Sequence, residues 1–477
     1  MVNFAAYMAD SDYSCERRMR MIPEEFKVKM QDVLGEEYPK FIEALENKSA
    51  VRGMRVNLLK AKPEELAASG EFKLEPLPYA DNGFILREER LMGASPYHHA
   101  GMVYMQDPGA MAALSAIDIE PEWWVLDACS APGGKSSQAS ERLTDGFILS
   151  NEYVPKRAKI VVSNFERLGI RNAIVTSLDT CELAKMYTAA FDLVITDAPC
   201  SGEGMFRKSD EALEDWSRDN VALCAERQKE ILGNVVHLVK PGGYLLYSTC
   251  TYSPEENEGV VSSFLENHED FSLVPVKPEL IEKTRPGIKK YAPNTENIEY
   301  ARRFYPHVSD GEGQFVALMK RNDDASVKTK ILYKDEAKPL SKQEAMIVGA
   351  FVKEALKEAP HGRIVKVGEN IVVVSHECPI PRKSTFMAGV LMGEIKGSTF
   401  SPSHNFFSAY GDLFKHRENL TREDDRTDKY LAGEEIDAST GVKGWCAVYF
   451  EGAPLGGGKA SSGRIKNHYP KGLRTRK

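Results

Sequence analysis

Long apolar runs are absent from this sequence. No stretch approaches the roughly 20 consecutive apolar residues that a membrane-spanning helix needs, although 42% of the residues are hydrophobic. Residues 1–26 contain no apolar core followed by a small-residue cleavage site, which is the pattern of a signal peptide. We therefore expect a cytoplasmic protein without a membrane partner.

Cysteine is scarce, and its spacing argues against two common roles. The 477 residues include eight cysteines, none of them in a C-x-x-C pair. This argues against a disulfide framework and against a tetrahedral zinc site, so we expect no metal. A single cysteine is most often a small buried hydrophobe, so only its context identifies a reactive one. The cysteines are Cys15, Cys129, Cys181, Cys200, Cys224, Cys250, Cys378 and Cys446.

A net positive charge is also missing, which at first disfavours a nucleic-acid partner. The formal net charge is −8, but the charge is unevenly placed. Residues 459–477 hold seven Lys or Arg and no acid, whereas residues 421–436 are mostly acidic. Basic charge gathered on one face binds phosphate even when the rest of the surface is acidic. The basic segment is therefore a candidate RNA contact through Arg464, Lys466, Lys471 and Arg474.

The chain divides by pattern into four segments. Residues 1–104 predict an RNA-binding α/β unit, within which residues 1–21 are a candidate for disorder. Residues 105–322 alternate strands and helices, and residues 323–340 form a polar linker. Residues 341–477 are rich in strands, which is typical of a separate binding domain rather than a catalytic one. Nothing in the pattern requires more than a monomer.

Helix and strand signals fill the N-terminal unit. Apolar residues from Phe26 to Leu45 recur at helical spacing, and Pro23 with two glutamates suits a first turn. A strand is expected at residues 52–60, with Arg52 and Arg55 on it. We expect these two arginines to contact an RNA backbone.

Residues 105–322 predict a parallel sheet. Strands that alternate with loops and helices are typical of a doubly wound sheet with helices on both faces. A last strand at residues 313–320 is expected to close this sheet at one edge. The parallel strands are expected at residues 123–128, 147–152, 172–177, 191–198 and 243–249.

The loop after the first of these strands lacks the common phosphate-binding fingerprints. VLDACSAPGGKS (125–136) matches neither G-x-x-x-x-G-K-[ST] nor G-x-G-x-x-G, yet its small residues let a ligand approach the backbone. Glu152 ends the second strand, Asp179 follows the third and Asp197 ends the fourth, and the carboxyl ends of parallel strands meet at one crevice. Glu152 suits a ribose diol and Asp179 an adenine amino group. These acids favour an adenosine-like ligand without a phosphate cradle, and S-adenosylmethionine fits that description.

Two cysteines follow strands that end at the same crevice. Cys200 comes after residues 191–198, and Cys250 comes after residues 243–249. Beside a methyl donor, such thiols indicate methylation at carbon 5 of a pyrimidine, because a thiolate that adds at carbon 6 makes carbon 5 electron-rich. This chemistry also needs an acid at N3, a base for the carbon-5 proton and a lowered thiol pKa. Lys135 is a candidate for lowering that pKa.

Several motifs resemble the Sun/Nop-type RNA cytosine-5 methyltransferases. The likeness extends over nearly the whole chain from about residue 22. It is nearest to the bacterial ribosomal small-subunit methyltransferase F group, whose C-terminal PUA-like domain contains a segment similar to residues 461–474. The motifs are ACSAPGGKS (128–136), DAPCSGEGMFRK (197–208), RQKEIL (227–232), KPGGYLLYSTCTYSPEENE (240–258) and RVNLLK (55–60).

The resemblance implies a fold, a reaction and a set of site residues. The implied fold is a Rossmann-like class I S-adenosylmethionine-dependent methyltransferase domain with an N-terminal α/β unit and a C-terminal PUA-like domain. The implied reaction forms 5-methylcytosine in 16S rRNA: Cys250 attacks carbon 6, Cys200 assists release of the product, and Asp197 contacts the N3 and amino edge of the base. The implied donor pocket consists of Ala128, Cys129, Ser130, Ala131, Pro132, Gly133, Gly134, Lys135, Glu152, Arg157, Asp179 and Asp197.

Other functions stay open at this point. A tRNA cytosine-5 methyltransferase would share these motifs, and a non-catalytic RNA-binding ribosome assembly factor could keep the same fold, although both thiols and Asp197 speak against it. An exocyclic-amine methyltransferase would carry [ND]-P-P-aromatic where this chain has DAPCSG. A DNA cytosine-5 methyltransferase uses the cysteine of a Pro-Cys pair, which would make Cys200 the nucleophile. We expect a cytosine in structured RNA, flipped or unpaired so that carbon 6 is reachable.

Overall fold

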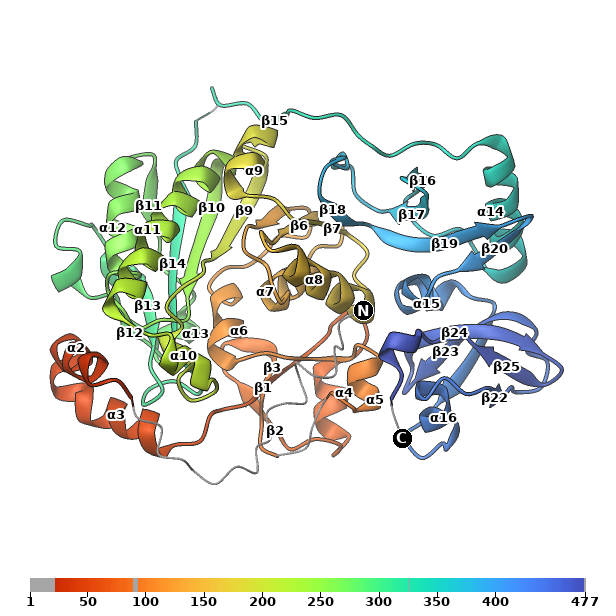
Figure 1. The fold of residues 1–477 in the computed structure, drawn as a ribbon, viewed down its shortest axis with the longest axis horizontal. Helices are drawn as coiled ribbons and strands as arrows, with labels where there is room; N and C mark the ends of the chain where they lie inside the picture. The colour runs from red at the N-terminus through yellow and green to blue at the C-terminus, as the bar shows by residue number, and fades with distance from the viewer. Residues whose placement is uncertain (1–21, 89–92, 325, 476–477) are drawn as a thin grey trace.

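The computed structural model describes residues 22–88, 93–324 and 326–475. Residues 1–21, expected as a candidate for disorder, lie outside them, and so does Cys15. Figure 1 shows three parts: N-terminal helices and a small sheet, a large central sheet with helices on both sides, and a strand-rich C-terminal part. Within the described residues, no helix is long and apolar enough to cross a membrane.

The N-terminal part combines a helical pair with a four-stranded antiparallel sheet. Gly35, with a φ of +52°, separates the two helices of the pair. Phe26 and Phe41 on them pack against Phe206 and Tyr252, with ring centroids 5.0 Å apart in both pairs. The pair therefore lies against segments of the central part. The elements are α2 (Glu24–Leu34), α3 (Tyr38–Asn47), α4 (Pro63–Ala68), α5 (Pro96–His99) and the sheet β2 (Leu74–Leu77), β3 (Ala80–Leu86), β1 (Gly53–Val56), β4 (Val103–Met105).

The central sheet has the expected parallel core. Its five parallel strands each overlap an expected strand, although the last of them begins at Val239, four residues earlier than expected. In spatial order these are β10 (Val239–Thr249), β9 (Phe191–Asp197), β5 (Trp124–Asp127), β6 (Phe147–Asn151) and β7 (Ala173–Thr176).

The strand after them does not lie at an edge, so that expectation is wrong. β14 (Gln314–Arg321) pairs with β10 on one side, and β11 and β13 pair with it on the other. All of these pairings are antiparallel, and β12 continues the sheet beyond β13. The extra strands are β11 (Phe271–Leu273), β12 (Arg285–Pro286) and β13 (Arg302–Phe304), with α13 (Pro278–Ile281) between the first two.

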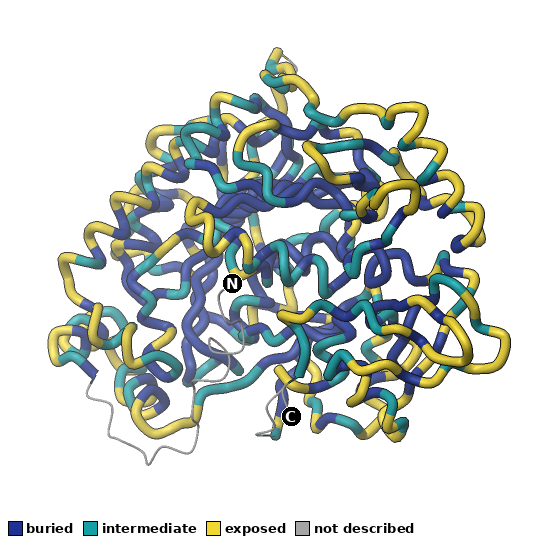
Figure 2. Tube along the Cα trace, turned by 45° about the vertical axis from the view of Figure 1, so that its right-hand side comes forward, coloured by how far each residue is buried: buried dark blue, intermediate teal, exposed yellow. Residues whose placement is uncertain are grey.

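Helices cover both faces of this sheet because its strands are apolar on both sides. Val125 and Ile148 contribute to the core on one face, while Leu126 and Leu149 contribute to the core on the other. The strands are buried along most of their length, and the exposed residues gather at the periphery (Figure 2). One face packs against α6 (Pro108–Leu114), α7 (Gly134–Ser140) and α8 (Pro155–Leu168), and the other against α9 (Thr180–Met186), α11 (Arg218–Val235) and α12 (Glu258–Asn267).

The C-terminal part contains two further sheets. Their spatial orders are β16-β17-β19-β20 and β21-β23-β24-β25-β22. The elements are α14 (Lys342–Ala355), β16 (Arg363–Val367), β17 (Asn370–Val374), β19 (Val390–Lys396), β20 (Thr399–Pro402), α15 (His404–Tyr410), β21 (His416–Leu420), α16 (Arg426–Leu431), β22 (Ile436–Asp437), β23 (Gly444–Phe450), β24 (Ala453–Ser461) and β25 (Arg464–Asn467).

The C-terminal part is joined to the central sheet, whereas the sequence suggested a separate domain. β18 (Thr385–Ala388) pairs antiparallel with β7 and so extends the central sheet (Figure 1). β15 (Lys330–Ile331), in the expected linker, pairs with β8 (Tyr187–Thr188). An unpaired edge strand exposes a row of backbone donors and acceptors. β18 covers such an edge, a pairing that no local sequence pattern indicates.

Lys60 forms hydrogen bonds with all three parts of the structure. Its Nζ donates to the carbonyl oxygen of Ala100 at 2.8 Å and to that of Arg167, in α8, at 3.1 Å. It also donates to Ser408 Oγ in α15 and to the carbonyl oxygen of Pro454 in β24, both at 2.8 Å. One ammonium group therefore bridges the N-terminal unit, the central sheet and the C-terminal part.

Candidate active site

Polar residues end the parallel strands at one edge of the central sheet. β5, β6, β9 and β10 end at Asp127, Asn151, Asp197 and Thr249. Because the strands are parallel, the loops that follow them meet at the same edge, where ligands of such sheets bind. The candidate site residues lie in or next to these loops, except Asp179, which lies between β7 and α9.

The loop after β5 is tightly folded. Gly133 has a φ of +104°, a conformation that favours glycine, and its N–H donates to the carbonyl oxygen of Ser130 at 2.6 Å. The N–H of Ser130 donates to the carbonyl oxygen of Asn151 at 2.8 Å. Ser130 Oγ is buried and has no hydrogen-bond partner among the described residues. This loop therefore presents an unused hydroxyl beside a folded backbone.

Glu152 and Arg157 hold the same loop from the next strand and helix. The Glu152 carboxylate accepts from the N–H of Ala131 at 3.3 Å and from that of Val154 at 3.0 Å. Arg157 donates to the carbonyl oxygen of Ala131 at 3.1 Å and lies 3.5 Å from the Glu152 carboxylate. The loop after β5 and the start of the next strand–helix unit, β6 and α8, therefore form one polar surface.

Asp179 has a local structural partner. It is the N-cap of α9, and its Oδ1 accepts from the backbone N–H of Cys181 at 2.8 Å. Such a cap satisfies one of the free N–H groups at the start of a helix. One of the two carboxylate oxygens is thus engaged, and the residue is half-buried.

Asp127 lies beneath the loop and is fully buried. Burial raises the pKa of its carboxyl group to about 7, and the nearby Asp197 adds to this effect, while the hydrogen bond from Ser136 Oγ, at 2.6 Å, opposes it. The sequence analysis did not identify Asp127 as a candidate site residue. Its charge state changes close to neutral pH.

Asp197 and Lys135 connect the loop after β5 with the end of β9. Lys135 Nζ lies 2.8 Å from Asp197 Oδ2, and Ser248 Oγ donates to Asp197 Oδ1 at 2.7 Å. The Lys135 side chain is 8% exposed, whereas that of Asp197 is 34% exposed, so the carboxylate still faces the crevice. The Lys135 ammonium was a candidate for lowering a thiol pKa, and in the structure its ion-pair partner is Asp197.

The two thiols meet above the ends of β9 and β10. Cys200 Sγ and Cys250 Sγ are 3.3 Å apart, and both residues are half-buried. The hydrogen bond with Cys250 raises the pKa of the Cys200 thiol well above its usual value, and burial raises it further. Cys200 is therefore a neutral thiol at neutral pH, in hydrogen-bond contact with the second sulfur.

Two buried glutamates beside the thiols were not identified from the sequence. Glu203 accepts from Thr251 Oγ1 at 2.8 Å, and Glu256 accepts from the N–H of Ser201 at 2.9 Å. Burial raises the pKa of Glu256 to about 7. The signal that could have found them is an acid close after each cysteine, in DAPCSGEG and in STCTYSPEE.

Comparison with known proteins identifies the family. Family models match residues 114–320 (16S rRNA methyltransferase RsmB/F), 22–108 (N-terminal domain of 16S rRNA methyltransferase RsmF) and 417–475 (methyltransferase RsmF PUA domain). The ribosomal RNA small subunit methyltransferase F of Aliivibrio fischeri (strain MJ11) is 31% identical, over 88% of this chain and 91% of that protein. This chain belongs to the RsmF family of 16S rRNA methyltransferases.

Further comparisons agree with this family. The small subunit methyltransferase F of Vibrio campbellii is 30% identical, over 95% of this chain and 97% of that protein. A solved methyltransferase homolog protein from Pyrococcus horikoshii is 29% identical with a TM-score of 0.55, over 63% of this chain and 95% of that one. The predicted fold, with a methyltransferase domain, an N-terminal unit and a C-terminal PUA domain, is therefore confirmed.

One arginine expected at the RNA surface of this RsmF-family chain is not there. Arg55 has no exposed surface, and it forms an ion pair with Glu141 and donates to Ser137 Oγ at 2.6 Å. The expectation that Arg55 contacts RNA is wrong, because a strand in contact with the central domain turns that side chain inward. Arg52 is half-buried and donates to the carbonyl oxygen of Glu88 at 3.0 Å.

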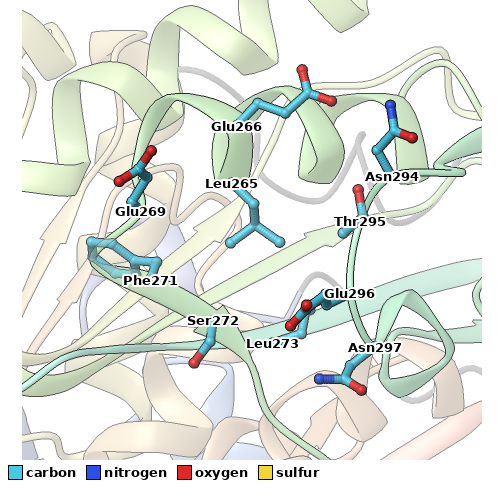
Figure 3. A pocket seen from close by; sticks show the side chains of 10 residues that line it. All are labelled: Leu265, Glu266, Glu269, Phe271, Ser272, Leu273, Asn294, Thr295, Glu296 and Asn297. Atoms are coloured by element: carbon cyan, nitrogen blue, oxygen red, sulfur yellow. The ribbon is translucent and has the colours of Figure 1, made fainter.

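A separate hollow lies away from the thiols. It has a volume of about 300 Å³ and is bounded by the end of α12, by β11 and by residues 294–297 (Figure 3). Three of its lining residues are acids, and none of the candidate site residues lines it. It therefore plays no part in the site described above. The acids are Glu266, Glu269 and Glu296.

Proposed function

We propose that this chain methylates carbon 5 of a cytosine in 16S rRNA through a covalent bond between Cys250 and carbon 6. The observation that carries the proposal is the contact of two sulfurs, 3.3 Å apart, at the carboxyl ends of neighbouring parallel strands. Covalent addition by a thiolate divides one difficult substitution into two easier steps. A second thiol in contact with the first suits the reverse step, in which the bond to the base must break.

The residues around the loop after β5 fit S-adenosylmethionine as the methyl donor. Glu152 offers a buried carboxylate suited to a ribose diol, and the buried Ser130 Oγ has no partner among the described residues. Arg157 and the backbone from Ala128 to Lys135 would complete the pocket, and the unengaged oxygen of Asp179 suits an adenine amino group. When bound, the donor supplies an electrophilic methyl group.

In the first step the Cys250 thiolate forms a bond to carbon 6 of the cytosine. The electron pair of the carbon 5–carbon 6 double bond moves through carbon 4 toward N3. Carbon 5 then forms a bond to the methyl carbon, as the bond between that carbon and the donor sulfur breaks. Asp197, fixed by Lys135 and Ser248, is placed to contact the N3 and amino edge of the base. Its pairing with a buried ammonium fixes the direction of the carboxylate, which in its ionised form would accept a hydrogen bond from the amino group of the base.

In the second step a base removes the carbon-5 proton and the bond between carbon 6 and sulfur breaks. The electron pair of that bond returns to Cys250, which regains its thiolate. Cys200, a neutral thiol in contact with Cys250, can donate a hydrogen bond to the departing sulfur. This leaves the methylated base aromatic and frees the product.

The RNA substrate is proposed from the family and from the exposed basic residues of the C-terminal sheet. Arg464, Lys466 and Lys471 are exposed, and Arg474 donates to the carbonyl oxygen of Tyr469 at 3.2 Å. Positive side chains that neutralise phosphates make binding fall with salt. The PUA match over residues 417–475 includes all four of them.

The deciding experiment compares wild type, Cys250→Ala and Cys200→Ala on small-subunit rRNA from a strain that lacks this protein. Each is incubated with radiolabelled S-adenosylmethionine and assayed for 5-methylcytosine and for a protein–RNA adduct that survives denaturation. We expect no product from Cys250→Ala and a trapped adduct with Cys200→Ala. Cys446→Ala, a buried thiol in β23, serves as the matched control and should behave as wild type.

Three other outcomes would contradict the proposal. If Cys250→Ala stays active while Cys200→Ala gives neither product nor adduct, Cys200 is the nucleophile and the roles are reversed. If wild type methylates tRNA but not rRNA, the substrate is different. A protein that gives no product on either RNA, while the Cys250→Ala variant still supports ribosome assembly in cells, would be a non-catalytic assembly factor.

A further inference from the structure

Two buried carboxylates flank the thiols without a part in the proposed bond-making steps. Glu203 follows Cys200 by three residues, and Glu256 follows Cys250 by six. Both side chains belong to residues with no exposed surface. A buried carboxylate is costly unless hydrogen bonds satisfy it, so their partners are informative.

Glu203 comes after the first thiol but binds the loop that contains the second. Its Oε2 accepts from Thr251 Oγ1 and from the N–H of Tyr252, both at 2.8 Å. Its Oε1 accepts from Ser253 Oγ at 2.5 Å and from Trp216 Nε1 at 2.9 Å. Three of these four donors belong to the three residues directly after Cys250.

Glu256 shows the reverse arrangement. It comes after the second thiol, and its Oε2 accepts from the N–H of Ser201, next to Cys200, at 2.9 Å. Its Oε1 accepts from Ser201 Oγ, and Gln228 Nε2 donates to its Oε2 at 2.9 Å. The hydroxyl oxygens of Ser201 and Thr251 lie 2.9 Å apart, so the two sets of bonds are adjacent.

We infer that Glu203 and Glu256 are positioning residues that form a crossed clasp, in which each carboxylate holds the backbone beside the other thiol and so keeps the two sulfurs in contact. This rests on the proposed function only in assigning the chemistry to the thiols. One backbone hydrogen bond joins the two loops, from the N–H of Gly204 to the carbonyl oxygen of Cys250 at 2.8 Å. The side-chain bonds of Glu203 and Glu256 add to it, and a network satisfied on every atom is rigid.

The two carboxylates differ in whether an amide can replace them. A glutamine at 203 would direct its NH2 group at either the Tyr252 N–H or the Trp216 Nε1–H, and both are donors that cannot accept. A glutamine at 256 can direct its NH2 group at Ser201 Oγ, whose proton then turns to Thr251 Oγ1. The clasp therefore predicts that Glu203→Gln is damaging and Glu256→Gln is mild, although both remove one buried charge.

The test measures kcat and KM for rRNA and for S-adenosylmethionine in Glu203→Gln, Glu256→Gln and Glu255→Gln. Glu255 is the control, because it lies in the same loop, its side chain is 55% exposed and it pairs with Lys29. We expect Glu203→Gln to lower kcat about 100-fold or more with both KM values changed less than about twofold. Glu256→Gln should keep kcat within about fivefold of wild type, and Glu255→Gln should match wild type.

A second measurement needs neither RNA nor turnover. The rate at which iodoacetamide alkylates Cys250 in the free protein is followed by peptide mass spectrometry, and we expect it to change at least about fivefold in Glu203→Gln only. If the Cys250→Ala enzyme proved active, the proposed function would fail, and this rate would still decide the clasp. Equal rates in all three variants, or equal kcat losses in the two buried ones, would overturn it.

A milder change covers the case in which Glu203→Gln does not fold. Ser253→Ala removes one of the four donors and leaves Trp216 on the same carboxylate oxygen. We expect kcat to fall about five- to tenfold with the melting temperature kept within a few degrees. A kcat equal to that of Glu255→Gln would contradict the clasp.

Discussion

The two halves of the crevice are built differently. In the donor half, the loop from Ala128 to Lys135 is held by Glu152 and Arg157, which come from the next strand–helix unit along the chain. In the thiol half, Glu203 and Glu256 bind across to each other's loops, and every one of their carboxylate oxygens is engaged. In the donor half, Ser130 Oγ has no partner among the described residues and is available to the proposed donor, while the polar atoms of the thiol half bond to one another.

This difference agrees with the roles proposed for the two halves. A ligand-binding wall gains from polar groups that are not fully used inside the protein, because the ligand then satisfies them. A covalent site gains from side chains held by a supporting set of hydrogen bonds, because small displacements of a nucleophile cost much of its rate. The ion pair of Lys135 with Asp197 joins the two halves.

The largest effect on activity is expected when the ion pair between Lys135 and Asp197 is removed. In Lys135→Ala the Asp197 carboxylate loses its ammonium partner at 2.8 Å and is left facing the crevice with Ser248 alone. We expect kcat/KM to fall about 100-fold or more, which is about 2.7 kcal/mol of transition-state stabilisation. Steady-state kinetics would measure it.

Lys156→Ala is the control for this change, because Lys156 is an exposed lysine on α8. Its kinetics should equal those of wild type. A Lys135→Ala enzyme with wild-type kcat and only a raised KM for the donor would show that Lys135 belongs to the donor half alone.

A smaller effect is expected from a change in the donor half that leaves the thiol half unaltered. Glu152→Ala removes the carboxylate that holds the N–H groups of Ala131 and Val154. We expect the dissociation constant for S-adenosylmethionine to rise about 30-fold, or about 2 kcal/mol, while the alkylation rate of Cys250 stays unchanged. Isothermal titration calorimetry measures the first quantity and peptide mass spectrometry the second.

Glu226→Ala, an exposed acid on α11, is the matched control. If Glu152→Ala altered the thiol reactivity as much as the donor affinity, the two halves would not be independent. The comparison drawn above would then be wrong.

The smallest expected effect concerns the pH dependence of stability. Burial raises the pKa of Glu256 from its usual 4.5 to about 7 in the folded protein. A group whose folded pKa is raised contributes stability that is complete below its unfolded pKa and is lost as the pH rises through its folded pKa. Between about pH 6 and pH 8, wild type should therefore lose about 1.4 kcal/mol of unfolding free energy relative to Glu256→Gln.

Urea unfolding of both proteins at several pH values would measure this difference. Glu255→Gln, at an exposed neighbouring position, should run parallel to wild type. A constant difference between wild type and Glu256→Gln across this range would mean that Glu256 does not titrate near neutral pH.

Much of the fold was open to prediction from sequence. Apolar runs that end in or precede Glu152, Asp179, Asp197 and Cys250 mark strands and the crevice together, because strand periodicity and turn residues are local signals. The interior position of β14 and the pairing of β18 with β7 were not predictable, because strand pairing across long loops depends on which edge stays open.

The sequence by itself determined the candidate site residues and the family: two thiols, three acids at strand ends and a glycine turn. Only the tertiary structure decided how these residues are paired. In the structure Arg55 points inward and pairs with Glu141, and Asp179 caps the N-terminus of α9. Glu203 and Glu256 each bind the loop that contains the other. The chemistry of a residue can be read from its own position in the sequence. Its interaction partner depends on how elements far apart in the chain pack together, and a local sequence pattern does not contain that information.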